Sequence, residues 1–377
     1  MCVSLARARL RLLFPALFIA GVLGGCAIHP LPENYSGAPT YQIVRQIRCE
    51  TREALIKVLF NYLTTADNMR HDNLDETSYK LGLTARDDYA RDPDSITRFD
   101  PSKLTGFAKT VVGLLYNTGI AYNYDLLGLE TNNIDPTFNL LRPLPITTQV
   151  GLNVTGTFDR QRQNERSFTV TDNAGNLLMH VHQDYCTGQL AQENFFYPIA
   201  GRVGVDRVII DFMQLTLFAN LGSINKDATK VAAPTEGPPT MVDQLQFVTA
   251  FGGTTTPKLT FIPLGRNFNF ADASLGLTNS RKDTHQLTVG LYLDQDGAKE
   301  IAADRREIFD GRRWKLVQPR GAGPVSVIGA KETSVTRSPF FGNLITASGT
   351  RAELGAAQAV EQFLTQKLFK PTIIVNQ

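Results

Sequence analysis

The sequence predicts an α+β fold, with an antiparallel sheet built from two β-rich blocks, packed helices and a helical portion at the N-terminal side. Three observations predict this class. Apolar residues recur every three or four positions near both ends of the chain, which is typical of amphipathic helices. Between these segments, apolar and polar residues alternate in two blocks. Short polar stretches separate the alternating runs, and short connections favour antiparallel neighbours.

Residues 41–135 form the predicted helical portion. Tyr41–Leu63 carries an apolar stripe at helical spacing, with its basic side chains on other faces. Those side chains could contact lipid headgroups, although a solvated helix face is commoner. A second helix is predicted over Lys103–Tyr116, with Ser102 as its N-cap. Ile120–Leu127 then alternates like a strand.

Residues 136–377 form the predicted α+β domain, which opens with a proline-punctuated connection at Pro136–Pro145. The first block is predicted to be a meander of strands near Val150–Asp159, Ser167–Thr171 and Leu177–Asp184, joined by a charged tip at Arg160–Arg166 and a turn at Asp172–Asn176.

A helix over Val208–Leu221 is predicted between the two blocks, followed by an exposed loop at 223–242. Gly201 and Gly204 precede this helix with the spacing of a phosphate-binding loop. The stretch lacks both the further glycine and the lysine that such loops use, so it is interpreted as a tight turn into the helix.

The second block is predicted to contain a hairpin with the clearest period-two alternation in the chain. Its predicted strands are Leu245–Phe251, Lys258–Ile262, Phe268–Thr278 and Gln286–Leu293, with a polar turn at Asn279–Thr284 between the last two. Helices are predicted over Ala298–Phe309 and Arg351–Leu368.

The N-terminus is predicted to carry an export signal. Basic residues precede the apolar run Leu12–Leu23, which ends in Leu23-Gly24-Gly25-Cys26. This stretch resembles the lipobox of bacterial lipoprotein signal peptides, in which a leucine and two small residues precede the acylated cysteine. The resemblance implies a signal peptide at residues 1–25, lipid on Cys26 and, because Ala27 is not aspartate, sorting to the outer membrane. The alternatives are an ordinary secretory signal and an uncleaved anchor, for which the apolar run is short of the roughly 20 residues a spanning helix needs.

Signal cleavage would leave 352 of the 377 residues, with a tether at residues 26–40. It would remove three arginines and no acidic residue, so that 38 basic and 36 acidic side chains become 35 and 36, a formal net charge of −1. No nucleic-acid partner is expected for such a chain. The expected partners are the membrane, through the lipid on Cys26, and an envelope protein or the cell wall.

Two cysteines remain after export, since Cys2 leaves with the signal and Cys26 carries lipid. A pair in an oxidising compartment predicts one disulfide between Cys49 and Cys186. The alternative is two buried free thiols.

The strongest candidate for chemistry is His180, His182 and Asp184, because residues two apart on a strand share a face and could ligate a metal together. Asp283 and His285 could add ligands from the second block. The alternative is the ordinary polar face of a half-exposed strand. A bridge from Cys186 would also cover that face, so no metal or other cofactor is expected.

The sequence therefore predicts a lipid-anchored protein on the periplasmic face of the outer membrane, with a structural or binding role and unknown catalytic residues. No GxSxG, HExxH or SxxK motif with its supporting residues is present. The alternative is an envelope hydrolase acting on glycan, peptide or ester bonds, with the two histidines and Asp184 as its centre.

Overall fold

The computed structural model describes residues 30–31, 34, 39–71, 74–144, 149–188, 194, 196–219, 221–222, 238–261, 267–294, 296–299, 336–338, 342–344 and 350–368. The lipobox and most of the predicted loop at 223–242 and helix at Ala298–Phe309 lie outside these ranges. The helices are α3 (Thr40–Thr64), α4 (Asn68–His71), α5 (Glu76–Arg91), η1 (Pro93–Arg98), η2 (Pro101–Lys103), α6 (Gly106–Asn117), α7 (Ala174–His180), α8 (Gln183–Cys186), η3 (Pro198–Ala200), α9 (Val205–Phe218) and α11 (Arg351–Leu368). The strands are β1 (Gly119–Pro143), β2 (Gln149–Thr155), β3 (Phe158–Asn173), β4 (Thr240–Thr255), β5 (Lys258–Thr260), β6 (Asn269–Tyr292), β7 (Thr336–Ser338) and β8 (Gly342–Leu344).

The fold is α+β, as predicted, and six of these strands form one antiparallel sheet. Its order is β2-β1-β6-β4, with β3 also pairing with β1 and β5 with β6. Two compact units divide the chain. Unit 1 takes its described residues from Met1–Gly37, Leu127–Glu165 and Ala250–Asp283, and unit 2 takes them from Ala38–Leu126, Arg166–Thr249 and Thr284–Gln377. The boundary expected between residues 135 and 136 lies within β1.

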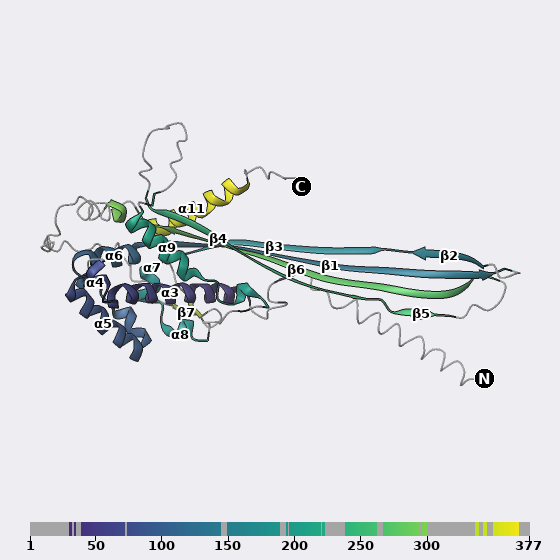
Figure 1. The fold of residues 1–377 in the computed structure, drawn as a ribbon, viewed down its shortest axis with the longest axis horizontal. Coiled ribbons are helices and arrows are strands. Elements are labelled where there is room, and N and C mark those ends of the chain that lie inside the picture. Colours follow the sequence, from purple (N-terminus) through teal and green to yellow (C-terminus); the bar gives the residue numbers. More distant parts are fainter. Residues whose placement is uncertain are drawn as a thin grey trace, which may run out of the picture. The chain divides into compact units, whose positions relative to one another are not determined.

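Unit 1 consists of long strands that lie side by side (Figure 1). β1 and β2 pair in a register that places Phe138 opposite Val154 and Leu140 opposite Leu152. The charged stretch predicted as a tip, Arg160–Arg166, lies within β3 instead. That prediction was wrong because a half-exposed strand accepts charged side chains as readily as a turn does.

The predicted connection at Pro136–Pro145 was also wrong, because both Pro136 and Pro143 belong to β1. Proline has no backbone N–H for a strand ladder. Pro136 lies opposite the break between β2 and β3, where the strand ladder is interrupted; its carbonyl still accepts a hydrogen bond from Gly156 N at 2.9 Å. Pro143 belongs to the last residue pair before the hairpin connection.

The predicted turn at Asn279–Thr284 is part of the continuous strand β6. Its polar residues remain in the strand because they are paired there. Arg281 and Asp283 are buried, and the Nε of Arg281 donates to the carboxylate of Asp283 at 2.9 Å. The turn predicted from these charged residues was therefore wrong, and the strand continues through them.

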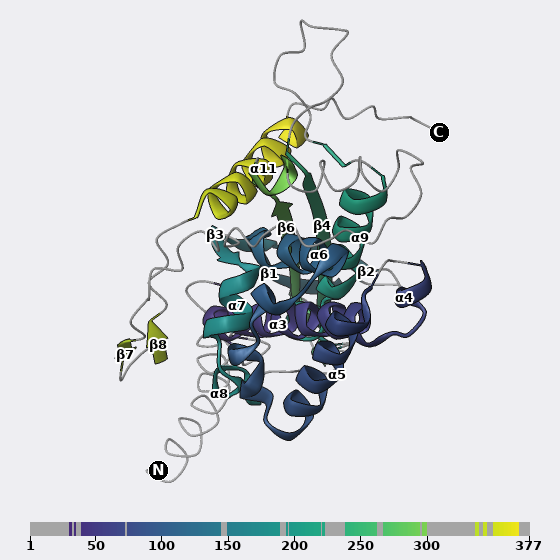
Figure 2. The same cartoon turned by 90° about the vertical axis from the view of Figure 1, so that its left-hand side faces the viewer.

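Unit 2 is built around α3, which confirms the helix predicted over Tyr41–Leu63. In Figure 2, α6 and α7 lie on one side of α3 and α5 lies on the other, and all three pack against it together with α9. Their apolar residues form one core with the inner parts of β1 and β6. The helix predicted over Lys103–Tyr116 is α6, which begins later because Pro101–Lys103 forms η2. α9 confirms the helix predicted before the loop.

The predicted strand at Leu177–Asp184 is wrong, since this stretch forms α7 and α8. The predicted turn before it contains the helix cap: the side chain of Asn173 accepts a hydrogen bond from Asn176 N at 3.2 Å. Ala174, Leu177 and Leu178 are buried at helical spacing.

α11 spans Arg351–Leu368, as predicted. Thr350 and Glu353 form a capping box, in which Thr350 N donates to the Glu353 carboxylate at 2.7 Å and Glu353 N donates to the Thr350 hydroxyl at 3.2 Å. A Cβ added to Gly290 of β6 would lie 2.5 Å from Val360, so the absence of a side chain there permits the close approach of α11. Among the helices that the structure describes, none combines the length and the apolar character needed to cross a membrane.

Candidate functional site

The structure separates the residues proposed as a metal site. His180 ends α7, His182 caps α8 and Asp184 lies in its first turn. The closest acidic contact of His182 is Asp94, with 3.6 Å between Nδ1 and Oδ1. His285 is buried in β6, where its Nε2 lies 2.5 Å from the hydroxyl of Tyr197. Within the described ranges, no group of three or more histidine, cysteine or acidic side chains is arranged to hold a metal ion.

Contacts with α3 hold α7 and α8 in place. A disulfide joins Cys49 to Cys186, and the guanidinium of Arg48 forms two hydrogen bonds to Asp172 at 2.5 and 2.7 Å. Arg45 Nε donates to the carbonyl of Tyr185 at 2.5 Å. These contacts bind the segment that carries the histidines to the N-terminal helix.

The three arginines of α3 thus make contacts within the protein. They form neither a solvated face nor a lipid-binding face. Arg52 is only 2% exposed and donates to the side chain of Gln183 at 3.1 Å. Burial alone would lower the pKa of Arg48, but the neighbouring carboxylate of Asp172 raises that pKa above its usual range, so the arginine stays charged. Sequence periodicity could not reveal this role, because the partners are more than 120 residues away along the chain.

Glu50 occupies the position where a phosphate would bind if the turn at Gly201–Gly204 were a phosphate loop. Its carboxylate accepts backbone hydrogen bonds from Val203 at 2.9 Å, Gly204 at 2.6 Å and Val205 at 3.2 Å, at the start of α9. Gly204 has a φ of +88°, which glycine adopts without strain. The helix N-terminus is therefore already neutralised by a side chain of the protein.

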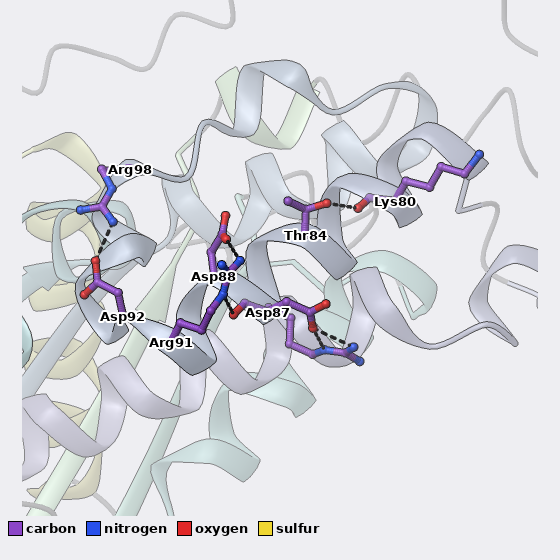
Figure 3. A network of polar contacts seen from close by, with 8 residues as sticks. Lys80, Thr84, Asp87, Asp88, Arg91, Asp92 and Arg98 are labelled. Atoms are coloured by element: carbon purple, nitrogen blue, oxygen red, sulfur yellow. Dashed lines mark hydrogen bonds and ion pairs between the residues drawn. The ribbon is translucent and has the colours of Figure 1, made fainter.

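A cleft of about 420 Å³ lies in unit 2 beside α5, η1 and η2. Its floor is apolar and includes Ile96 and Phe99, and its rim holds paired charges. Figure 3 shows two of these pairs: Arg91 reaches Asp88 at 2.6 Å, and Arg98 reaches Asp92 at 2.7 Å.

Two acidic groups of this cleft have lowered pKa values. The hydrogen bond from Arg98 lowers the pKa of Asp92, and the hydroxyl of Ser102 lowers that of Asp100. Three acidic and three basic side chains line the cleft, so it carries no net charge and suits a neutral or zwitterionic group.

A buried polar cluster in unit 1 holds the N-terminal segment. Arg281 donates to the carboxylate of Glu130 at 3.1 Å and to the carbonyl of Leu31 at 2.7 Å, while its Nε binds Asp283. Leu31 belongs to the predicted tether, so at this point the tether contacts the sheet of unit 1. The only hint of this contact in the sequence is the presence of charged residues in an otherwise regular strand.

Unit 1 also exposes apolar side chains that the sequence analysis did not single out. We call them the apolar face: Phe138, Val150, Leu152, Val154, Leu259 and Phe261, each between 40% and 66% exposed. Their alternation with polar residues could have revealed a one-sided sheet, but alternation alone does not show that the apolar side is left uncovered.

Comparisons with known proteins show the family of the chain. A family model described as "Uncharacterised protein y4kA" matches residues 29–311. A protein of Sinorhizobium fredii (strain NBRC 101917 / NGR234) with this description is 30% identical over 293 residues, which are 76% of this chain and 84% of that protein. Among solved structures, a chain of the ETEC pilotin–secretin AspS–GspD complex covers 55% of this chain and is matched over 57% of its own length, at 9% identity. Its TM-score of 0.19 is too low to support any inference. On the sequence matches, the chain belongs to the Y4kA family.

Proposed function

We propose that this protein is a lipoprotein of the bacterial envelope, held by lipid on Cys26 at the periplasmic face of the outer membrane, with a structural or binding role. The observation that carries the proposal is Leu23-Gly24-Gly25-Cys26 at the end of a basic and apolar export signal. Several acyl chains on one cysteine anchor a protein durably, whereas a single chain does not.

The remaining cysteines support export. Cys49 and Cys186 are bonded to each other across a sequence separation of 137 residues. Disulfides persist in oxidising compartments such as the periplasm and are rare in the cytosol. A cysteine pair that bridges two distant segments is therefore consistent with the periplasmic location that the lipobox predicts.

The geometry favours binding over hydrolysis. The hydrolase hypothesis placed His180, His182 and Asp184 on one face of a strand, whereas His180 and Asp184 lie on two short helices and His182 lies between these helices. The neutral cleft beside α5 and the apolar face of unit 1 are surfaces that a partner could cover. An envelope protein or the cell wall is the partner we propose for the cleft.

The test is the mass of the N-terminal peptide and the distribution of the protein between cell fractions. The full chain, Cys26→Ser and the matched control Cys2→Ser are expressed in a bacterium that processes lipoproteins. We expect acyl mass on a peptide beginning at Cys26, in the outer-membrane fraction, for the full chain and the control. Cys26→Ser should lack that mass and be released by a carbonate wash. An N-terminal peptide that begins elsewhere, or that carries no lipid, would refute the proposal.

A further inference from the structure

We infer that the apolar face of unit 1 lies on the bilayer in which the lipid of Cys26 is anchored, so that the protein contacts the membrane with its sheet as well as its lipid. This inference rests on the proposed lipidation.

The apolar face extends across several neighbouring strands. Val154 lies opposite Phe138 in the pairing of β2 with β1, and Leu259 lies opposite Ala273 in the pairing of β5 with β6. The register shared by the Asn139–Asp272 and Glu130–Arg281 contacts places Phe138 of β1 opposite Ala273 of β6. Phe138, Ala273 and Leu259 therefore share one face, and the apolar face continues from the β1–β2 pair to the β5–β6 pair.

The opposite face of the same strands carries a run of paired polar side chains. Asn153 lies opposite Asn139 in the pairing of β2 with β1, and the amide of Asn139 donates to Asp272 of β6 at 2.6 Å. The ammonium of Lys258 lies 3.4 Å from the same carboxylate. A sheet with one apolar and one polar face is suited to a boundary between lipid and water.

The N-terminal segment reaches the sheet on its apolar face. Glu130 and Phe138 are an even number of residues apart along β1, so their side chains project from the same face. Glu130 binds Arg281, and Arg281 binds the carbonyl of Leu31. Glu130 and Asn139 are nine residues apart on β1, and their partners Arg281 and Asp272 are nine residues apart on β6. The two strands therefore keep one pairing register between these contacts.

The tether is short enough to hold this face at the membrane. Leu31 is five residues after Cys26 along the chain, a separation that can span at most about 18 Å. The lipid must therefore enter the bilayer within that distance of the point where Arg281 holds the chain. Phe138 is eight residues after Glu130 along β1, a separation of about 27 Å in a strand, so a sheet lying along the membrane brings the apolar face to the same surface.

The residues around the apolar face suit lipid better than a second copy of the chain. Arg142 lies opposite Val150 in the strand register and so projects from this face, where it can meet anionic headgroups. Its guanidinium also lies 6.0 Å from the centre of the Phe268 ring, and aromatic and basic residues together are typical of the membrane interface. The unpaired backbone groups at the sheet edges need water or a hydrogen-bonding partner, so the strands cannot enter the hydrocarbon core of the bilayer. We therefore expect the strands to lie at the level of the lipid headgroups, with the side chains of the apolar face inserted below them.

The test uses tryptophan fluorescence in the full acylated chain. The single tryptophan, Trp314, is replaced by phenylalanine, and Leu152→Trp is compared with Asn153→Trp, the next residue of β2 on the opposite face. Each protein is reconstituted into vesicles of phosphatidylethanolamine and phosphatidylglycerol, with and without lipids brominated on their acyl chains. The same samples are analysed for acyl mass at Cys26.

We expect brominated lipid to quench the Leu152→Trp protein about twofold or more and to leave the Asn153→Trp protein nearly unchanged. Equal quenching at both positions, or quenching at neither, in a protein that carries its acyl mass would overturn the inference and leave the lipidation standing. Blue-shifted emission of Leu152→Trp without quenching would mean that a second copy covers the face, and would also overturn it. Absence of acyl mass would refute the proposed function and, with it, this inference.

Discussion

The carboxylate of Glu50 should be one of the largest single contributors to the stability of unit 2. It is 6% exposed and accepts three backbone hydrogen bonds at the start of α9. Glu50→Gln keeps the shape of the side chain but replaces one oxygen with an amide group that donates. At least one backbone N–H of Val203, Gly204 or Val205 then faces a donor instead of an acceptor.

The magnitude follows from these contacts. One buried N–H left without an acceptor costs about 1 to 3 kcal/mol, and loss of a negative charge at a helix N-terminus costs about 0.3 to 1 kcal/mol more. We therefore expect Glu50→Gln to lower the free energy of unfolding by about 1 to 4 kcal/mol. With a denaturant slope of about 1 to 3 kcal/mol per molar urea, the unfolding midpoint should fall by about 1 M.

The assay is urea unfolding followed by circular dichroism, together with hydrogen exchange of the three amides. The matched control is Glu53→Gln, one turn along the same helix, where the carboxylate is 32% exposed and lies 4.0 Å from the ammonium of Lys57. This carboxylate also accepts a hydrogen bond from the hydroxyl of Tyr89, which the amide oxygen of glutamine can still accept. A surface pair of this kind contributes about 0 to 1 kcal/mol. Equal midpoints for the two variants, with unchanged exchange of Val203, Gly204 and Val205, would show that Glu50 does not hold the start of α9.

Two further predictions concern the bridge and the last helix. The double variant Cys49→Ser and Cys186→Ser should lower the free energy of unfolding by about 2 to 5 kcal/mol, because the bridge closes a long loop; a loss below about 1 kcal/mol in urea titrations would contradict this. Burial raises the pKa of Glu353 above its ordinary 4.5, so the stability linked to this group is fully present below that pH and is lost as pH rises through the raised pKa. Glu353→Gln keeps an acceptor for the capping box and stays neutral at every pH. The urea midpoint of this variant should therefore rise relative to that of the natural protein as the pH goes from acidic to neutral. A difference in midpoint that does not change with pH would contradict the raised pKa of Glu353.

The helices were largely predictable from sequence, and the strands were predictable in place but not in length. The periodicity of α3 and α11 is local, since each helix shows its apolar stripe within a few turns. The ends of β1 and β6 depend on partners elsewhere: Pro136 is tolerated opposite a strand break, and Arg281 is tolerated because Glu130 and Asp283 pair with it. Neither condition can be read from the residues of the strand itself.

The candidate site was misread for a similar reason. His180, His182 and Asp184 have the spacing of a strand face, but Asn173 caps a helix just before them and apolar residues follow at helical spacing. A short stretch satisfies both periods, and tertiary contacts decide between them. Here the ion pair of Arg48 with Asp172 and the bridge at Cys186 bind the stretch to α3.

The sequence by itself determined the α+β class, and it predicted an export signal ending at Cys26 and a cysteine pair for a bridge, because each depends on residues close together in the chain or on a simple count. Only the tertiary structure decided which side of each element is covered. It buried Arg52 of α3, filled the start of α9 with Glu50 and left the apolar face of unit 1 exposed. Burial depends on what lies across the fold from a residue, and in this protein those neighbours are commonly more than a hundred residues away.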